Sequence, residues 1–433
     1  MNRNVLPFII SVLVIFSVVF LSACRSGMAS ISNPARESNN NVGNSADGNS
    51  GSEVEEVIRI GIIGPLTGNN AFGGNESANA VAIACEMYGE VLGKKVVAET
   101  ADAGDVTQVM SEFERLYAKG VRFFIGTYGA YADSAIQKVV DERGAFLMSV
   151  SSWADELTEN KINNYFHYTP RVSVFGTQMA VHMPRYAKEY LGIEKEELRV
   201  AVIWNTNVEY VATSALNGLR EAGIEPVYTG GYPIDQKDFT ALVAQLQSAQ
   251  IDVLIPCQSS ADGIPFRKKM VEMGYEPSML FAMGMIYDQP DFGDLGSDIV
   301  DGCLVLSYTY PSINQEAAPG LAEFVGAYNK KYGWEPLTHA TQTYSATVFL
   351  LDMIEETGED DVDKVVVKME SVQIPKGQYP NYWGIEFDEY HRNIYAGDPL
   401  VIGQWQKGIL VSVGTPEIAR GEPMIPWDAS KLD

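Results

Sequence analysis

Apolar runs alternate with amphipathic segments along most of the chain, beginning at residues 57–88. The run at residues 57–64, VIRIGIIG, is nearly continuous, as in a parallel strand that is covered on both faces. Glycine, proline and asparagine follow, and apolar residues then recur at helical spacing as far as residue 88. A strand that leads into a helix N-terminus presents free N–H groups at the sheet edge where open α/β folds bind ligands. The pattern therefore predicts a ligand-facing unit here.

The alternation then continues in two series. The first predicts strands at residues 95–100, 121–125 and 145–149, with helices at 106–117 and 132–143. The second predicts strands at 199–203, 226–230, 251–256 and 279–283, with helices at 209–222, 239–249 and 264–273. Strands that alternate with helices indicate a parallel sheet with right-handed crossovers. Two similar series predict two α/β lobes, and the extended segment 165–170 (YFHYTP) is expected to be one crossing between them.

The alternation of predicted strands and helices becomes less regular beyond residue 301. The pattern predicts a strand at 303–308, helices at 320–332 and 340–356, and a hairpin from strands 399–405 and 408–413. Two consecutive helices after a strand fit a chain that returns to the first lobe. We therefore expect a first lobe of residues 56–170 and 305–390, and a second lobe of residues 171–304 and 391–433.

The N-terminal residues have the features of a targeting signal. Arg3 precedes an apolar run at residues 8–20, and Leu21-Ser22-Ala23-Cys24 resembles a bacterial lipobox. The resemblance implies that residues 1–23 are removed and that Cys24 carries the lipid that holds the protein to the membrane. An uncleaved anchor is the alternative, although the run is shorter than the ~20 residues of a spanning helix. Residues 24–55 are rich in Ser, Asn and Gly, so they are expected to form a disordered tether.

Composition narrows the possible partners. At 433 residues and 46% hydrophobic, the chain can bury more than one core. A formal net charge of -25 argues against nucleic acid and against adhesion to anionic lipid through a basic surface. Cys85, Cys257 and Cys303 are scattered and odd in number, which predicts buried free thiols; pairing of Cys257 with Cys303 is the alternative.

Catalytic and cofactor motifs are missing from the sequence. It contains no G-x-S-x-G, H-E-x-x-H or C-x-x-C, and no Gly-Lys-Ser/Thr follows the first glycine-rich turn as in a P-loop. Each histidine is isolated: His167, His182, His339 and His391. We therefore predict a protein that is not an enzyme and holds neither cofactor nor metal.

Polar and aromatic residues gather instead where predicted strands end. Small hydroxyls and helix N-terminal N–H groups hold carboxylates, and aromatic rings bury an apolar ligand body. Helix capping is the alternative role for each serine or asparagine. The candidate ligand-binding residues are Tyr128, Ala130, Tyr131, Ser151, Ser152, Trp153, Asn207, Ser259, Met285 and Tyr287.

Several motifs resemble one family. They are IGIIGPLTG at residues 60–68, DAGD at 102–105, KGVRFFIG at 119–126, ADELT at 154–158 and KDFTALVAQLQSAQIDVLI at 237–255. Together they are similar to the type I periplasmic substrate-binding proteins of the leucine/isoleucine/valine-binding family. The resemblance implies an α/β fold of two doubly wound parallel-sheet lobes joined by three hinge strands. It also implies capture of an amino acid, amide or small organic acid for the permease of an ABC importer.

Departures from the family pattern bear on the ligand. Ala130 and Tyr131 stand where the family's amino-acid binders have a serine, and Ser151 and Trp153 replace an alanine and a threonine. The family's second-lobe tyrosine and glutamate fall near Ser259 and Met285, so the carboxylate partner of a ligand ammonium is not where the family places it. The positions of the family's first-lobe disulfide are Gly104 and Gly129.

The sequence thus predicts an extracytoplasmic, lipid-anchored binding protein for a small carboxylate-bearing solute. Trp153 is expected to stack on the ligand body, which makes an aromatic or flat carboxylate at least as good a candidate as a branched-chain amino acid. The alternatives are a sensory protein on the same fold and, less favoured, an exported hydrolase.

Overall fold

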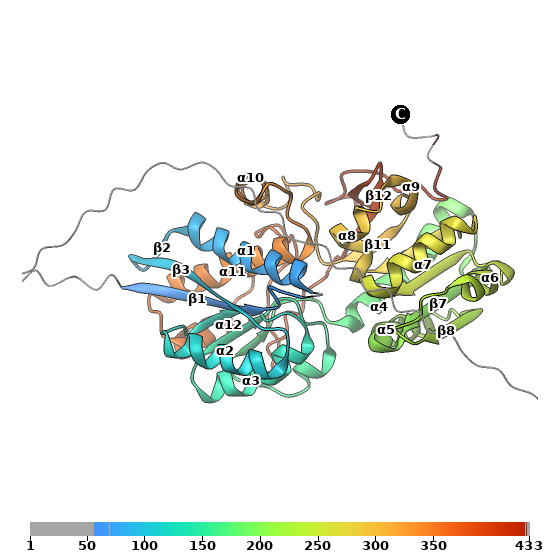
Figure 1. Ribbon diagram of the computed structural model, residues 1–433. Coiled ribbons are helices and arrows are strands. Elements are labelled where there is room, and N and C mark those ends of the chain that lie inside the picture. Colours follow the sequence, from blue (N-terminus) through green and yellow to red (C-terminus); the bar gives the residue numbers. More distant parts are fainter. Residues whose placement is uncertain (1–55, 69, 429, 431–433) are drawn as a thin grey trace, which may run out of the picture. The chain divides into compact units, whose positions relative to one another are not determined.

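The computed structural model describes residues 56–68, 70–428 and 430, which form two α/β lobes (Figure 1). The signal segment, Cys24 and the expected tether up to residue 55 lie outside the described residues. In the described part of the chain, no helix is both long and apolar enough to cross a membrane.

The first lobe is built on a six-stranded sheet. Its order is β2 (Glu90–Val91), β3 (Lys94–Asp102), β1 (Val57–Gly64), β4 (Phe123–Ile125), β5 (Phe146–Ser149) and β6 (Tyr165–His167). Neighbouring strands are parallel, except that β2 is antiparallel to β3. Ile60 and Ile63 of β1 face opposite sides of the sheet and are both fully buried, as the continuous apolar run predicted.

Helices cover both faces of this sheet. One face packs against α1 (Ala71–Tyr88), α11 (Thr338–Thr357) and α12 (Val362–Glu370), and the other against α2 (Val106–Ala118) and α3 (Ala130–Glu142). The helix α10 (Leu321–Tyr332) also joins this lobe, because its Phe324 ring stacks on Tyr344 of α11 at 4.1 Å.

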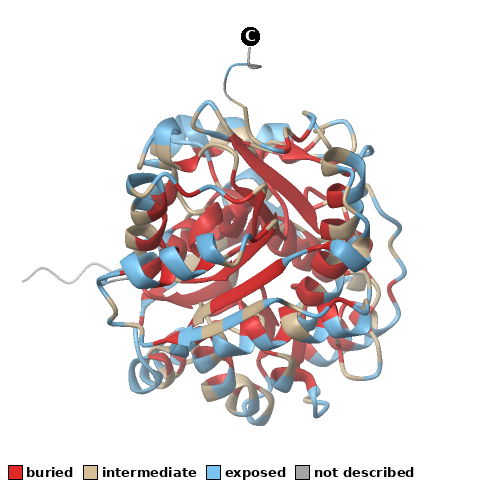
Figure 2. Ribbon diagram, turned by 90° about the vertical axis from the view of Figure 1, so that its right-hand side faces the viewer, coloured by how far each residue is buried: buried red, intermediate tan, exposed pale blue. Residues whose placement is uncertain are grey.

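The second lobe is built on a seven-stranded sheet. Its order is β13 (Ile409–Val413), β12 (Val401–Gln406), β11 (Leu304–Ser307), β10 (Met279–Met283), β9 (Val253–Cys257), β7 (Val200–Asn205) and β8 (Tyr228–Tyr232). The strands β7 to β11 pair in parallel, and β12 is antiparallel to both β11 and β13. In Figure 2 the strands of the molecule are mostly buried, whereas the outer faces of the helices are exposed.

Helices also cover both faces of the second sheet. One face packs against α4 (Val172–Tyr186) and α5 (Glu209–Glu221), the other against α6 (Thr240–Ser248) and α7 (Ser260–Glu272). The short helices α8 (Pro290–Gly293) and α9 (Ser297–Val300) precede β11. Cys85, Cys257 and Cys303 are buried free thiols, as expected.

The chain crosses between the lobes three times. The crossings lie between β6 and α4, between β11 and α10, and between α12 and β12. The segment predicted as one crossing therefore begins as an edge strand of the first sheet and leaves it after His167. Sheet pairing assigns Leu304–Ser307 to the second sheet, and the backbone of His391 and Asn393 pairs with His167 of the first. The lobe boundaries given from the sequence stay a prediction.

Candidate functional site

Loops from both lobes meet at the carboxyl ends of the parallel strands, where Trp153 of the first lobe adjoins Gly284 of the second. In the first lobe, the loop after β4 leads into α3 at Ala130, and the loop after β5 contains Ser151 to Trp153. Gly129 has a φ of 89°, which a side chain would disfavour, so glycine lets the chain turn into α3 here. In the second lobe, β10 is followed by the short helix η5 (Met285–Asp288).

An aromatic cluster joins the two lobes. Trp153 of the first lobe stacks on Phe175 of α4, with ring centroids 4.7 Å apart, and meets Tyr308 edge-on at 5.2 Å. The His339 ring, at the start of α11, lies 5.2 Å from the ring of Tyr128 and 6.2 Å from that of Tyr308. Burial lowers the pKa of His339 to about 4, so its ring is neutral at physiological pH.

Asp288 brings a buried carboxyl to this cluster from the second lobe. A Cβ added at Gly284 would lie 2.9 Å from Cη2 of Trp153 and 3.5 Å from Oδ2 of Asp288, so the indole and the carboxyl adjoin the same backbone position. The Ser307 hydroxyl donates to Oδ2 at 2.5 Å, and the Gln289 amide donates to Oδ1 at 2.7 Å. Burial raises the pKa of Asp288 to about 6.

Glu76 brings a second buried carboxyl from α1 of the first lobe. Its Oε1 accepts a hydrogen bond from the backbone N–H of Leu337 at 2.7 Å, immediately before α11. Burial raises its pKa to about 8; the backbone N–H groups of Leu337 and Ala340 oppose that rise, and the nearby Asp288 adds to it. The Asp288 and Glu76 carboxyls also raise the pKa of the Tyr128 hydroxyl, although burial is the larger cause.

Two serine hydroxyls beside Trp153 are buried. Neither Ser151 Oγ nor Ser152 Oγ has a hydrogen-bond partner among the described residues. Buried hydroxyl groups are nearly always hydrogen-bonded, so both are available to a bound ligand. The Ser152 carbonyl bonds to Nε2 of His167 at 2.9 Å, which fixes the backbone of this loop.

The other residues predicted for the site have different surroundings. Ser259 precedes α7, and its backbone N–H donates to Oδ1 of Asp262 at 3.0 Å, as in a capping box; its hydroxyl donates to the same oxygen at 2.7 Å. Tyr287 is fully buried and donates to Gln258 at 2.5 Å, within the core of the second lobe. Tyr131 and Asn207 are exposed, and Met285 is partly buried with a φ of 63°.

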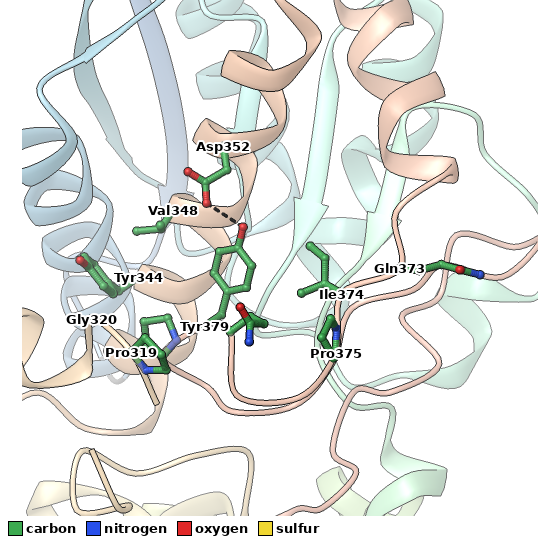
Figure 3. A pocket seen from close by; sticks show the side chains of 11 residues that line it. Pro319, Gly320, Tyr344, Val348, Asp352, Gln373, Ile374, Pro375 and Tyr379 are labelled. Atoms are coloured by element: carbon green, nitrogen blue, oxygen red, sulfur yellow. Dashed lines mark hydrogen bonds between the residues drawn. The ribbon is translucent and has the colours of Figure 1, made fainter. Parts of the chain in front are cut away.

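Two pockets lie away from this interface. One, of about 390 Å³, lies in the first lobe between α11 and residues 373–380, with Asp352 and Tyr379 in its wall (Figure 3). Both oxygens of the Asp352 carboxyl already accept, from the hydroxyls of Tyr88 at 2.9 Å and Tyr379 at 2.6 Å. The other, of about 480 Å³, lies between α7, α9 and Trp427. Among the described residues, no group of His, Cys, Asp or Glu is arranged to hold a metal ion.

Four residues of this interface were not among the candidates predicted from the sequence: Glu76, Asp288, Tyr308 and His339. Asp288 ends the segment that contains the candidates Met285 and Tyr287, but it was not itself predicted as a candidate. Glu76 carries the clearer signal, because it follows the glycine-rich turn by two residues on α1. The helical spacing of Ala78, Val81 and Cys85 predicts that Glu76 lies on the polar face of α1, whereas it is only 2% exposed.

Comparisons with known proteins agree with this architecture. The sequence profile of the family described as Periplasmic binding protein matches residues 57–408. A curated relative, Leu/Ile/Val-binding protein homolog 7 of Brucella suis biovar 1 (strain 1330), is 29% identical over 377 residues, which cover 85% of this chain and 94% of the relative.

Solved structures share the fold. A leucine-binding protein from Thermotoga maritima MSB8 superposes with a TM-score of 0.67 at 22% identity, covering 82% of this chain and 97% of the other. A solute-binding protein of an ABC transporter from R. palustris, in complex with benzoate, gives a TM-score of 0.69 at 16% identity, covering 86% and 99%. The family profile spans most of the chain and the two-lobed fold is the same, so this protein belongs to the type I, Leu/Ile/Val-binding-like periplasmic binding proteins.

Proposed function

We propose that the protein captures a small α-amino acid between its two lobes and delivers it to an ABC permease. One observation carries this proposal: the buried Asp288 carboxyl of the second lobe and the Trp153 ring of the first adjoin the same glycine, beside the hydroxyls of Ser151 and Ser152. Asp288 would pair with the ligand ammonium. The two hydroxyls, with the N–H groups at the start of α3, would hold the ligand carboxylate.

The buried carboxyls of the protein favour an amino acid over a ligand that carries a carboxylate but no ammonium. A ligand carboxylate without an ammonium would meet the Asp288 carboxyl, which is mostly ionised at pH 7 because its pKa is about 6, with no cation between the two anions, and burial strengthens such repulsion. The name of the Brucella relative also supports an amino-acid ligand.

An aromatic carboxylate is the second candidate. The partly buried Trp153 supports it, as does the benzoate bound to the R. palustris neighbour. Phe175 already covers one face of the indole, which leaves the other face or the edge for a ligand.

Matched ligand pairs test the proposal. We would measure the thermal stability of the protein with L-phenylalanine against 3-phenylpropionate, and with L-leucine against 4-methylpentanoate; within each pair only the ammonium differs. The amino acid of at least one pair should stabilise the protein, by about 2.7 kcal/mol at 100 times its Kd, and its partner should not. Asp288→Asn should remove that difference. Stronger stabilisation by 3-phenylpropionate would favour the second candidate, and no response to any amino acid would contradict the proposal.

We also propose that a lipid on Cys24 anchors the protein at the extracytoplasmic face of the membrane. The lipobox-like tetrad at residues 21–24 supports this. Cys24→Ala should release the protein from the membrane fraction, or leave it unprocessed, with no change in ligand affinity. Equal retention of variant and wild type on membranes would contradict the anchor.

A further inference from the structure

Glu76 holds an oxygen that the protein leaves without a partner. The residue is 2% exposed, and Oε1 bonds to the Leu337 backbone. Its Oε2 atom is buried and has no hydrogen-bond partner among the described residues. In the ionised form of Glu76 a buried carboxylate oxygen without a donor is costly, so the ionised form is expected to take its partner from outside the chain.

The surroundings of Glu76 belong to the lobe interface. A Cβ on Gly73, nearly one helical turn earlier in α1, would lie 2.5 Å from the Tyr128 ring, so that ring covers the start of α1 beside Glu76. Two residues after its backbone partner Leu337 comes His339, whose ring contacts those of both Tyr128 and Tyr308. The charge of Asp288 acts on Glu76 from the second lobe.

None of these neighbours supplies a cation. The titratable groups that interact with Glu76 are Tyr128 after β4, Tyr328 on α10 and Asp288 on η5, and the His339 ring of α11 lies against Tyr128. Burial keeps both tyrosines and the histidine neutral, and Asp288 is itself an acid. In the described part of the chain, no Lys, Arg or His forms an ion pair with Glu76. The interface therefore holds two interacting buried carboxyls, and the ammonium of a simple amino acid would pair with only one of them.

We propose that Glu76 selects an amino acid whose side chain carries a second cationic nitrogen, which donates to Oε2 of Glu76 while the α-ammonium pairs with Asp288. This inference rests on the proposed function, because it assigns the ligand's far end within the same site. It makes Glu76 a specificity-determining residue and a basic amino acid the ligand class.

Proton uptake and release give the proposal a second readout. With a pKa of about 8, Glu76 is mostly protonated at pH 7 in the ligand-free protein. A bound cation favours the ionised form, so binding at pH 7 should release about one proton per ligand. For the same reason, affinity for a dicationic amino acid should rise between pH 6.5 and pH 8.5.

L-lysine and L-norleucine form the critical pair, since they differ only by the terminal ammonium. Calorimetric titration of the full chain at pH 8.0 should show L-lysine binding at least tenfold tighter than L-norleucine. Titration in buffers of different ionisation enthalpy should show proton release with L-lysine alone. In Glu76→Gln, the amide keeps the acceptor for Leu337, and both the tenfold preference and the proton release should disappear while L-norleucine still binds.

The control is Glu86→Gln, which removes an equal charge from an exposed site on α1 where Glu86 pairs with Lys331. It should retain the preference for L-lysine. Equal or tighter binding of L-norleucine by the wild type, or an undiminished preference in a folded Glu76→Gln, would overturn the role of Glu76 and leave the amino-acid proposal standing. If Glu76→Gln does not fold, the wild-type proton count and ligand pair decide alone. If no amino acid binds the wild type, both proposals fail.

Discussion

At the scale of single residues, the buried Glu76 carboxyl makes the stability of the ligand-free protein depend on pH. Burial raises the pKa of Glu76 from its ordinary value of 4.5 to about 8. A group whose pKa is higher in the folded than in the unfolded chain contributes stability that is fully present below the unfolded pKa. That contribution is lost as the pH rises through the folded pKa. For Glu76 the loss therefore occurs between about pH 4.5 and pH 8.

Replacing Glu76 should remove this loss. Glu76→Gln should increase the free energy of unfolding at pH 8.5 by a few kcal/mol, to an order of magnitude, and change it little at pH 4.5. Urea unfolding of the ligand-free protein at both pH values would measure the effect, with Glu86→Gln as the exposed control. The expectation would be wrong if the two variants showed the same pH dependence.

Trp153 packs against other side chains of the protein, in addition to the ligand contact that its sequence context predicted. It was expected to stack on the ligand, and the structure places it between Phe175 and Tyr308, where it also joins the lobes. Trp153→Ala should lower affinity for the best amino acid at least tenfold, because the ring closes the site, whereas Trp153→Phe should retain most of it. Titration calorimetry on the folded variants would measure both affinities. Unchanged affinity in Trp153→Ala would make the residue a packing residue and move the site elsewhere.

At this scale the sequence pattern points to segments of the chain, but not to the side-chain contacts that those segments make. Residues 128–131, 151–153 and 285–287 were chosen as candidates because polar and aromatic residues follow predicted strands, and their binding role stays a prediction. Which side chain faces the other lobe depends on packing between segments far apart in the chain. The sequence pattern does not encode the contact of Gly284 with Trp153, or that of Glu76 with Leu337.

At the scale of secondary structure elements, apolar runs predicted the strands because parallel strands are buried on both faces. The strand β10, Met279–Met283, has the bounds that were expected. Helix α4 was missed. It contains Gly176 and Pro184, which usually mark turns, and its exposed Val181 blurs the amphipathic pattern. Its stability comes from packing on α5 rather than from local propensity.

That packing needs glycine at two facing positions. A Cβ at Gly176 of α4 would lie 2.2 Å from the backbone oxygen of Ser214, and one at Gly218 of α5 would lie 2.2 Å from the backbone oxygen of Gly176. Gly176→Ala should therefore lower stability by about 1–3 kcal/mol, since neither backbone can move away without repacking the lobe.

Gly326→Ala is the matched control for Gly176→Ala. A Cβ at Gly326 in α10 meets nothing within 4 Å, so this change should stabilise by up to about 1 kcal/mol through helix propensity. Thermal unfolding of both variants tests the pair, and equal effects would refute the close approach of α4 and α5.

At the scale of the whole molecule, the repeated strand and helix series predicted the two lobes, and the family resemblance predicted three connections between them. Both agree with the sheets and the crossings of the structure. The chain after residue 301 was harder to assign, because it visits the second sheet, the first lobe and the second sheet again. Contacts from both lobes to one ligand would favour their closed arrangement.

The central claim is that one amino acid is held by both lobes at the Trp153 and Asp288 interface. A crystal structure of the protein with the amino acid that stabilises it most would test this directly. We predict a ligand whose carboxylate lies within hydrogen-bond distance of Ser151 or Ser152 and whose ammonium lies within that distance of Asp288. A ligand bound instead in the pocket beside Asp352 and Tyr379, or one that touches a single lobe, would contradict the account.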